Sequence, residues 1–437
     1  MRAPSLRVNV VWALAGNGIS AVSSWLMLVV LAKLGTVETV GVLGIAQAIG
    51  IPISALLSLK LQQVQVTDAR GEYSFGEYHA LKILASAAMV ACIAGAAFGF
   101  YSGEAAAVTT VMGLGYAVIE LREMFLAVMQ KAERMDQMSI SRAMLGVGQL
   151  VLFAAFFWVS RSLTVGVLGM LVGRLVVLWL YDVPVVRRLL LLDAREPRER
   201  GVTPRWHWLG LWRLTKLSAP LGLAGGVGML FMSIPRLTLD KVCGTEAVGY
   251  YVAVSSLLSV GVLLVGAIGQ TVCPRLARYY DENRRAFRAL LLKTILVAVA
   301  LGGGAILVSA VCGRWVLTLL FTPAYGEYQG LFVELMVAAT VLYLFSCMNV
   351  ALTAARQFGV QLPIYALAAL ACGVSSYVLI PRLGTHGAAW SVMICYGVGF
   401  IGCWIALLLA ERRNPLGAAS VEYGAACGSP LQGQADA

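Results

Sequence analysis

The chain has 437 residues, of which 59% are hydrophobic and 13% charged, and its mean hydropathy is +0.81. Soluble domains carry roughly twice this share of charged residues, so the composition excludes a soluble protein and predicts an integral membrane protein. The formal net charge of +11 is typical of membrane proteins with basic cytoplasmic loops, and it requires no nucleic-acid partner.

Apolar runs long enough to cross ~30 Å of hydrocarbon, which takes about 20 helical residues, follow one another along the chain. The runs are continuous and rich in Gly, Ala and Leu, whereas strands of a membrane barrel alternate between apolar and polar residues. We therefore predict an all-α integral membrane protein with about twelve transmembrane helices, at 9–32, 40–60, 80–101, 105–128, 140–160, 163–182, 214–239, 247–271, 290–312, 328–352, 358–380 and 386–409.

Basic residues concentrate in alternate connections between these runs, and this asymmetry predicts the orientation of the chain. The positive-inside rule places such connections in the cytoplasm. An even number of spans then leaves both termini in the cytoplasm. The basic positions on that side include Arg70, Lys131, Arg134, Arg187, Arg188, Arg195, Arg198, Arg200, Arg205, Arg275, Arg278, Arg284, Arg285 and Arg288.

One short phrase occurs twice, about half a chain length apart. The stretch LAKLGTVETVG, which ends at Gly41, nearly recurs as LDKVCGTEAVG, which ends at Gly249, 208 positions later. Each copy closes one span, crosses a short outer turn and enters the membrane from the same side. The repeat is therefore parallel, with its halves related by an axis along the membrane normal. Shorter echoes pair Gln62 with Gln270, Arg161 with Arg382 and Gly166 with Gly387.

The repeat divides the chain into two six-helix bundles. We expect an N-terminal bundle over 1–186, a basic cytoplasmic linker over 187–213, a C-terminal bundle over 214–409 and a disordered cytoplasmic tail over 410–437. Two bundles about a central cleft favour transport by alternating access, because a substrate can lie between bundles that rock against each other. Duplication kept for folding alone is the alternative.

Three stretches resemble one superfamily of membrane transporters. They are AGNGISAVSSWLMLVVLAKLGTVETVGVLGIAQAI, at 15–49, APLGLAGGVGMLFMSIPRLTLDKVCGTEAVGYYVAVSSL, at 219–257, and LIPRLGTHGAAW, at 379–390. These stretches are similar to polysaccharide exporters of the Wzx type, in the MOP superfamily that also includes MATE drug exporters and the lipid II flippase MurJ.

The resemblance implies both a substrate and a location. Wzx-type proteins move undecaprenyl-diphosphate-linked oligosaccharide repeat units across the bacterial inner membrane for the synthesis of O-antigen, capsule or exopolysaccharide. The implied partners are this glycolipid, membrane lipids, a polysaccharide polymerase and a chain-length regulator. A carrier of such an anionic, polar and lipid-tailed substrate needs a hydrated cationic cavity with side openings for the tail.

Arg174 is the first candidate for that cavity. It lies near the middle of the sixth predicted span, where a charge costs at least ~2.5 kcal/mol, and the flanking Gly169 and Gly173 would let a neighbouring helix approach closely. Arg174 either lines the cavity or forms a structural pair with a buried acid or with helix-end carbonyls.

Arg236 and Asp240 follow Pro235 in the seventh span. Pro235 can kink the helix because it lacks an N–H group, and the i,i+4 spacing places the two charges on one face. They form either an ion pair near the outer end or a substrate-binding arginine whose charge is balanced by an acid that takes part in coupling.

Four other cations are candidates for lining the cavity. Lys33 and Lys241 occupy the same repeat position at outer helix ends, where snorkelling to the interface is the alternative. Lys60 and Arg122 lie toward inner helix ends. The alternative for Arg122 is a local pair with an acid, either Glu120 or Glu123.

Glu334, inside the tenth span, is a candidate for binding the ion that is coupled to transport.

No catalytic residue, cofactor or metal site is predicted, because no phosphate-binding glycine loop or nucleophile–base set is evident. Two other functions remain open. A MATE-like ion-coupled exporter of small cationic compounds would favour acidic cavity residues, and a membrane polysaccharide polymerase or ligase would need a long outer loop.

Overall fold

Helices form all of the regular structure in the part of the chain that the structure describes. The computed structural model describes residues 6–68, 72–193, 203–355 and 357–413. The N-terminal half contains α1 (Leu6–Leu34), α2 (Val37–Leu57), α3 (Leu61–Thr67), α4 (Phe75–Phe100), α5 (Gly103–Lys131), α6 (Met135–Ser160), α7 (Leu163–Val177), the π-turn η1 (Leu178–Asp182) and α8 (Val183–Asp193).

The C-terminal half repeats this order of long helices. It contains α9 (Trp208–Cys243), α10 (Thr245–Ser256), α11 (Leu258–Glu282), α12 (Arg284–Leu320), the short 3-10 helix η3 (Pro323–Tyr328), α13 (Gln329–Ala354), α14 (Phe358–Leu383) and α15 (Thr385–Arg413).

Ten helical segments of the described chain are long and apolar enough to span a membrane, or eleven if the bent pair α10 and α11 forms one span. The remaining predicted span corresponds to α5, which has 29 residues and packs between α2, α4 and α7. The predicted all-α membrane protein with about twelve transmembrane helices, in two bundles related by a parallel repeat, is confirmed.

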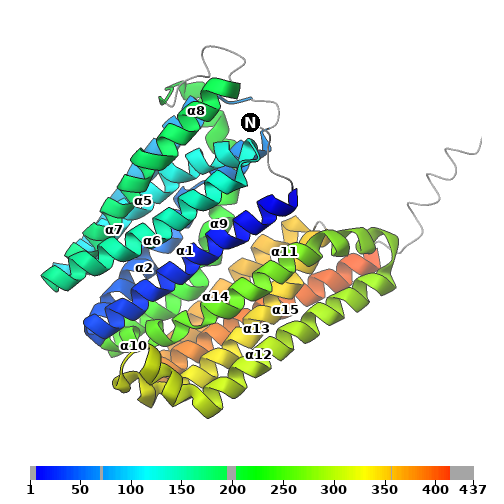
Figure 1. Ribbon diagram of the computed structural model, residues 1–437. Helices are drawn as coiled ribbons and strands as arrows, with labels where there is room; N and C mark the ends of the chain where they lie inside the picture. Colours follow the sequence, from blue (N-terminus) through cyan, green and yellow to red (C-terminus); the bar gives the residue numbers. More distant parts are fainter. Residues whose placement is uncertain (1–5, 69–71, 194–202, 356, 414–437) are drawn as a thin grey trace, which may run out of the picture.

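The helices form two bundles that meet at one end and diverge toward the other (Figure 1). In the first bundle α1 and α7 pack on α6 while α4 packs on α5, and in the second α13 and α14 pack on α15. We call the end that holds the start of α1 and the end of α15 the terminal end. The opposite end, where α1 turns into α2 and α9 into α10, is the closed end.

The two copies of the repeated phrase pack against each other at the closed end. Gly41 of α2 lies so near α10 that a Cβ atom there would collide with the carbonyl oxygen of Thr245. Gly249 of α10 has the same relation to the carbonyl oxygen of Val37, at the start of α2. Small residues let membrane helices approach this closely. The repeated phrase thus builds a symmetrical contact that joins the halves.

The two seams between the halves are packed unequally. Helix α2 packs along both α9 and α10, and Gly222 and Gly226 of α9 leave room for Leu56 near the end of α2. Helix α1 meets α10 over a much shorter stretch. One seam is therefore closed over most of its length, whereas the seam beside α1 is held mainly by α10.

Two local distortions lie near the ends of the second and sixth predicted spans, 40–60 and 163–182. The second span breaks between α2 and α3, where Leu59 and Lys60 adopt positive φ angles of 51° and 49°. The sixth span contains the π-turn η1, with α8 continuing beyond it. Both distortions redirect side chains that belong to buried polar contacts.

Helices reach into both regions predicted to be irregular. Helix α8 continues to Asp193, and α9 begins at Trp208 rather than at 214, because Leu211 and Leu214 are buried against α3 and α4. Much of the described part of the predicted linker is therefore helical. Helix α15 runs to Arg413, and the tail beyond it lies outside the described residues.

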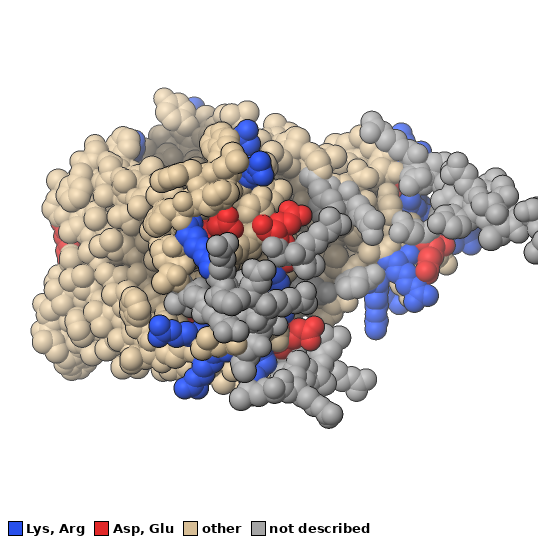
Figure 2. All heavy atoms as spheres, turned by 90° about the horizontal axis from the view of Figure 1, so that it is seen from above, with Lys and Arg blue, Asp and Glu red and all other residues tan. Residues whose placement is uncertain are grey.

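Charged side chains gather on part of the molecular surface, while a broad area carries none (Figure 2). The described basic positions that the sequence assigns to the cytoplasm lie at or near the ends of helices at the terminal end, as on α8 and at the start of α12. The remaining predicted positions, Arg70, Arg195, Arg198 and Arg200, lie outside the described residues.

Candidate substrate-binding site between the two halves

Arg174 is buried in the N-terminal half, with 5% of its surface exposed. Its guanidinium lies 6.0 Å from the centre of the Tyr116 ring on α5. Gly115 provides the space that the guanidinium fills, because a Cβ atom there would collide with Nη1. The Nε atom of Arg174 has no hydrogen-bond partner among the described residues. This arginine therefore retains an unused donor inside the membrane span.

Arg236 is buried in the C-terminal half, with 9% of its surface exposed. Its Nη1 donates a long hydrogen bond of 3.5 Å to Oε1 of Gln47, which lies on α2 of the other half. Its Nε, like that of Arg174, finds no partner in the described part of the chain. Arg236 thus faces the seam between the halves with most of its donors free.

Tyr116 links the two arginines. Its phenol lies within electrostatic reach of both guanidinium groups, and Gly50 of α2 makes room for its ring. We call Arg174, Arg236, Tyr116 and Gln47 the central arginine site. Counted along their helices, these residues lie roughly 10–20 Å from the closed end, which is a mid-membrane depth.

Neither arginine of this site forms an ion pair within the described residues. Buried charges are normally paired, because removing a charge from water is expensive. Both guanidinium groups of the site therefore lack a counter-charge among the described residues. Arginine forks suit phosphate oxygens in particular, since two parallel N–H groups can donate to one phosphate.

Asp240 is not part of the central arginine site, and the ion pair between Arg236 and Asp240, one of the two predicted alternatives, is absent from the described contacts. The Asp240 carboxylate accepts hydrogen bonds of 2.9 Å from the Tyr101 phenol and from the Thr245 hydroxyl. Burial and the adjacent carboxylate raise the pKa of Tyr101, so its phenol remains a donor. Because Tyr101 follows α4, this bond joins the two halves near the closed end.

Arg122 forms a structural contact within the N-terminal half. Its Nε donates to Asp182 at 2.6 Å and its Nη2 to the Ser141 hydroxyl at 2.7 Å. Arg122 is 2% exposed and Asp182 is fully buried. The alternative to a cavity role, a local pair with Glu120 or Glu123, is replaced by a pair with Asp182, because the π-turn η1 brings this acid inward from 60 positions away. An acid therefore already neutralises this cation.

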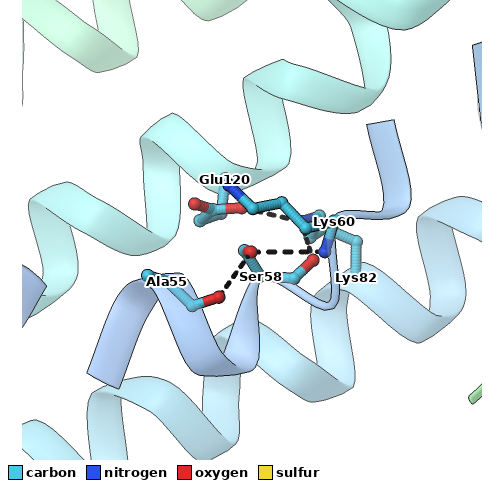
Figure 3. Close-up of polar contacts among 5 residues, drawn as sticks. All are labelled: Ala55, Ser58, Lys60, Lys82 and Glu120. Carbon is cyan, nitrogen blue, oxygen red and sulfur yellow. Dashed lines mark hydrogen bonds and ion pairs between the residues drawn. The ribbon is translucent and has the colours of Figure 1, made fainter. Parts of the chain in front are cut away.

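The break between α2 and α3 is fixed by a buried lysine (Figure 3). Nζ of Lys82 donates to the Ser58 carbonyl oxygen at 2.8 Å and pairs with Glu120 at 2.7 Å. The Ser58 hydroxyl donates to the Ala55 carbonyl oxygen and accepts from the backbone N–H of Lys60. This set of contacts closes the end of α2 and sets the direction of α3.

The Lys60 side chain extends from this break toward the other half. Its Cε would lie 3.0 Å and its Nζ 3.8 Å from a Cβ atom on Gly225 of α9. No ion pair with a described acid involves Lys60. Lys60 is therefore a cation on the seam, nearer the terminal end than the central arginine site.

The other predicted site residues lie toward the closed end. Lys33 and Lys241 are exposed, and Nζ of Lys241 lies 5.5 Å from the centre of the Phe100 ring. Glu334 is paired with His386, with 2.8 Å between Oε2 and Nδ1. None of these three side chains belongs to the central arginine site.

The sequence does not predict that Tyr116 and Gln47 belong to the central arginine site. Tyr116 does not stand out in the sequence, because a tyrosine in an apolar run is ordinary in a membrane helix. Gln47 is likewise an ordinary polar residue in an apolar run, where its usual role is an interhelical hydrogen bond. Their roles depend on helices that are distant in sequence, and the small residues Gly50 and Gly115 beside Tyr116 were the available signal.

The fold is shared with transporters and flippases of the MOP superfamily. An inward-facing conformation of a multidrug resistance MATE family transporter matches with a TM-score of 0.72 and 12% identity, over 95% of this chain and all of that one. The lipid II flippase MurJ, in an inward closed conformation, matches with a TM-score of 0.71 and 11% identity, over 91% of this chain and 87% of that chain.

A relative at the sequence level comes from polysaccharide synthesis. The capsular polysaccharide biosynthesis protein CapF of Staphylococcus aureus is 25% identical over 395 residues, which cover 90% of this chain and 97% of that protein. No model of a protein family matches the chain. The predicted resemblance is thus confirmed in the fold, which is that of MATE transporters and MurJ, and in a sequence relative from capsular polysaccharide biosynthesis. The chain is a multi-pass membrane protein.

Proposed function

We propose that this protein is a flippase that translocates undecaprenyl-diphosphate-linked oligosaccharide repeat units across the bacterial inner membrane by alternating access. The observation that carries the proposal is the pair of buried, acid-free arginines, Arg174 and Arg236, one on each half of the molecule. A diphosphate supplies the missing negative charge. The relative in capsular polysaccharide biosynthesis and the fold shared with MurJ support a lipid-linked sugar as the substrate that contains this diphosphate.

The placement of the arginines favours a transport cycle. Because each half contributes one guanidinium, a bound diphosphate draws the halves together at mid-membrane depth, and their rearrangement passes it to the other side. The bundles diverge toward the terminal end (Figure 1), while Gly41 and Gly249 hold the opposite end shut. Substrate in this conformation enters from the terminal end.

The unequal seams suit a substrate with a lipid tail. The seam between α2 and α9 is tightly packed, with Gly222 against Leu56, whereas α1 makes little contact with the other half. A polyprenyl chain can therefore remain in the bilayer beside α1 while the diphosphate and sugars occupy the space between the halves. We place the terminal end in the cytoplasm, because the basic loops lie there.

The two alternative functions have less support. An exporter of small cations needs acidic cavity residues, but the central arginine site is cationic. A polymerase or ligase needs a large extramembrane loop, but the longest described connection at the closed end is 321–328, which is mostly the short helix η3.

Lipid-linked oligosaccharide in cells that lack the protein tests the proposal. We expect the glycolipid to accumulate on the cytoplasmic leaflet and to return to the periplasmic leaflet when the intact gene is supplied. In a strain without a redundant flippase, an unchanged distribution between the leaflets would favour the exporter of small compounds instead.

A further inference from the structure

The geometry points to a sugar-binding pocket at the terminal end of the N-terminal half, which holds pyranose residues of the carried oligosaccharide; this inference rests on the proposed function. The pocket has a volume of 460 Å³ and lies between α3, α5 and α6. Its polar lining consists of Gln62, Gln63, Thr67, Gln130, Ser139 and Arg142.

The polar groups of this pocket match the chemistry of sugar hydroxyls. Three glutamine amides line it, on Gln62, Gln63 and Gln130, and none forms a side-chain hydrogen bond to another described residue. Each amide offers two donors and an acceptor, and a sugar hydroxyl both donates and accepts. The amides can therefore exchange hydrogen bonds with neighbouring hydroxyls of one ring.

Arg142 adds a positioned donor to the pocket. Its Nη1 donates to Oδ1 of Asn17 on α1 at 2.5 Å, which fixes the guanidinium and leaves its other N–H groups available. Met135 and Met138 also line the pocket and supply flexible apolar surface for the C–H faces of a sugar. The lining contains one cation and no carboxylate, so it favours a neutral polyol over a metal ion or a nucleotide triphosphate.

The pocket lies at a suitable depth for the distal part of the substrate. Gln62 follows Gln47, a member of the central arginine site, by 15 positions through α2 and α3, which corresponds to roughly 20 Å along the helices. An extended short oligosaccharide spans such a distance. With the diphosphate at the arginines, its sugars reach toward the terminal end and the pocket.

The break in the second span is what brings α3 to this position. Lys82 closes the end of α2 through Ser58 and Glu120 (Figure 3), so that α3 starts in a new direction and presents both Gln62 and Gln63 to the pocket. The buried lysine is thus a positioning residue for the pocket.

Binding of two lipids that differ only in their sugars tests the inference. The probes are undecaprenyl diphosphate and the lipid-linked oligosaccharide extracted from cells that lack this protein, each offered to the purified protein in lipid nanodiscs. The variants are Gln62→Leu and Gln130→Leu. The matched control is Gln361→Leu, which removes an amide near the terminal end of α14 in the other half, outside the pocket.

The pocket predicts a selective loss of affinity. Each pocket variant should bind the oligosaccharide-bearing lipid about tenfold more weakly, as expected for the loss of one or two hydrogen bonds, and bind undecaprenyl diphosphate as the wild type does. Equal affinity of wild type, control and pocket variants for the oligosaccharide-bearing lipid overturns the pocket while leaving the proposed function intact. A wild-type protein that binds neither lipid overturns both.

Discussion

Buried cations are of two kinds in this molecule. Four Lys or Arg side chains are buried among the described residues, namely Lys82, Arg122, Arg174 and Arg236. Lys82 and Arg122 each have an acidic partner within 2.7 Å, and both stabilise one half of the molecule. The arginines of the central site have none. The first two cations stabilise the fold, whereas under the proposed function the second two bind the diphosphate of the substrate during transport.

Replacing either arginine of the central site should weaken binding of undecaprenyl diphosphate. In Arg174→Gln or Arg236→Gln, a charge-assisted interaction worth about 1.5–3 kcal/mol is lost, which corresponds to a roughly tenfold to hundredfold lower affinity. Titration of the purified protein in nanodiscs measures this. Lys33→Gln is the matched control, because Lys33 is exposed near the closed end. Equal losses in all three variants would argue for a nonspecific charge effect.

The Arg122–Asp182 pair should affect stability instead. Asp182→Asn leaves a buried guanidinium without its counter-charge, so the free energy of unfolding should fall by about 3–5 kcal/mol. Replacing both residues, as in Arg122→Met with Asp182→Leu, should restore most of it. Unfolding in detergent micelles measures these changes.

The control for that experiment is Arg278→Met. Arg278 pairs with Glu282 on the surface, where both side chains are more than half exposed, and such a pair contributes about 0.5 kcal/mol or less. If Asp182→Asn loses no more stability than this control, the interpretation of Arg122 as a structural residue is wrong.

At the scale of helices, the closed end explains why the sequence repeats itself. The repeated phrase ends one helix and starts the next in each half, and its glycines let α2 and α10 cross in van der Waals contact. Asp240 is the one charged residue that the second copy adds where the first has Ala32. Asp240 accepts a hydrogen bond from Tyr101 of the opposite half. The contact between the two copies is therefore reinforced by a polar bond between the halves.

A methyl group at these glycines should push the closed end apart. Gly41→Ala and Gly249→Ala each place a Cβ atom against a backbone carbonyl that cannot move aside cheaply. We expect the distance between spin labels at positions 38 and 246, near the starts of α2 and α10, to lengthen by a few ångströms. Gly95→Ala, where a Cβ atom meets open space, should leave it unchanged. Unchanged distances in all three variants would contradict the closure.

The sequence predicts helix placement far better than the contacts between helices. Membrane spans are predictable because a bilayer requires a continuous apolar length, and the repeat is evident from the two phrases that end at Gly41 and Gly249. The break at Lys60 and the π-turn ending at Asp182 cannot be predicted in this way, since each is stabilised by residues distant in sequence. For the same reason the sequence left open whether Arg236 pairs with Asp240, which instead accepts a hydrogen bond from Tyr101 of the other half.

At the scale of the molecule, several features indicate that the space between the halves opens toward the terminal end. The halves meet at the closed end and along α2 and α9, and they diverge toward the terminal end on the side of α1 (Figure 1). Between these two ends, each half carries one arginine without an acidic partner among the described residues. The seam beside α1 is the looser of the two. Together these features suit a carrier that takes an anionic headgroup from one leaflet and leaves its lipid tail in the membrane.

Translocation by the purified protein tests the central claim most directly. Liposomes containing extracted lipid-linked oligosaccharide are made with the wild type, Arg174→Gln, Arg236→Gln or Lys33→Gln, and sugar exposed on the outer leaflet is oxidised by external periodate. Flipping should make the inner pool accessible with the wild type and the Lys33 variant, and at least tenfold more slowly with either central arginine variant. A wild type no faster than empty liposomes, or arginine variants as fast as the wild type, would contradict the account.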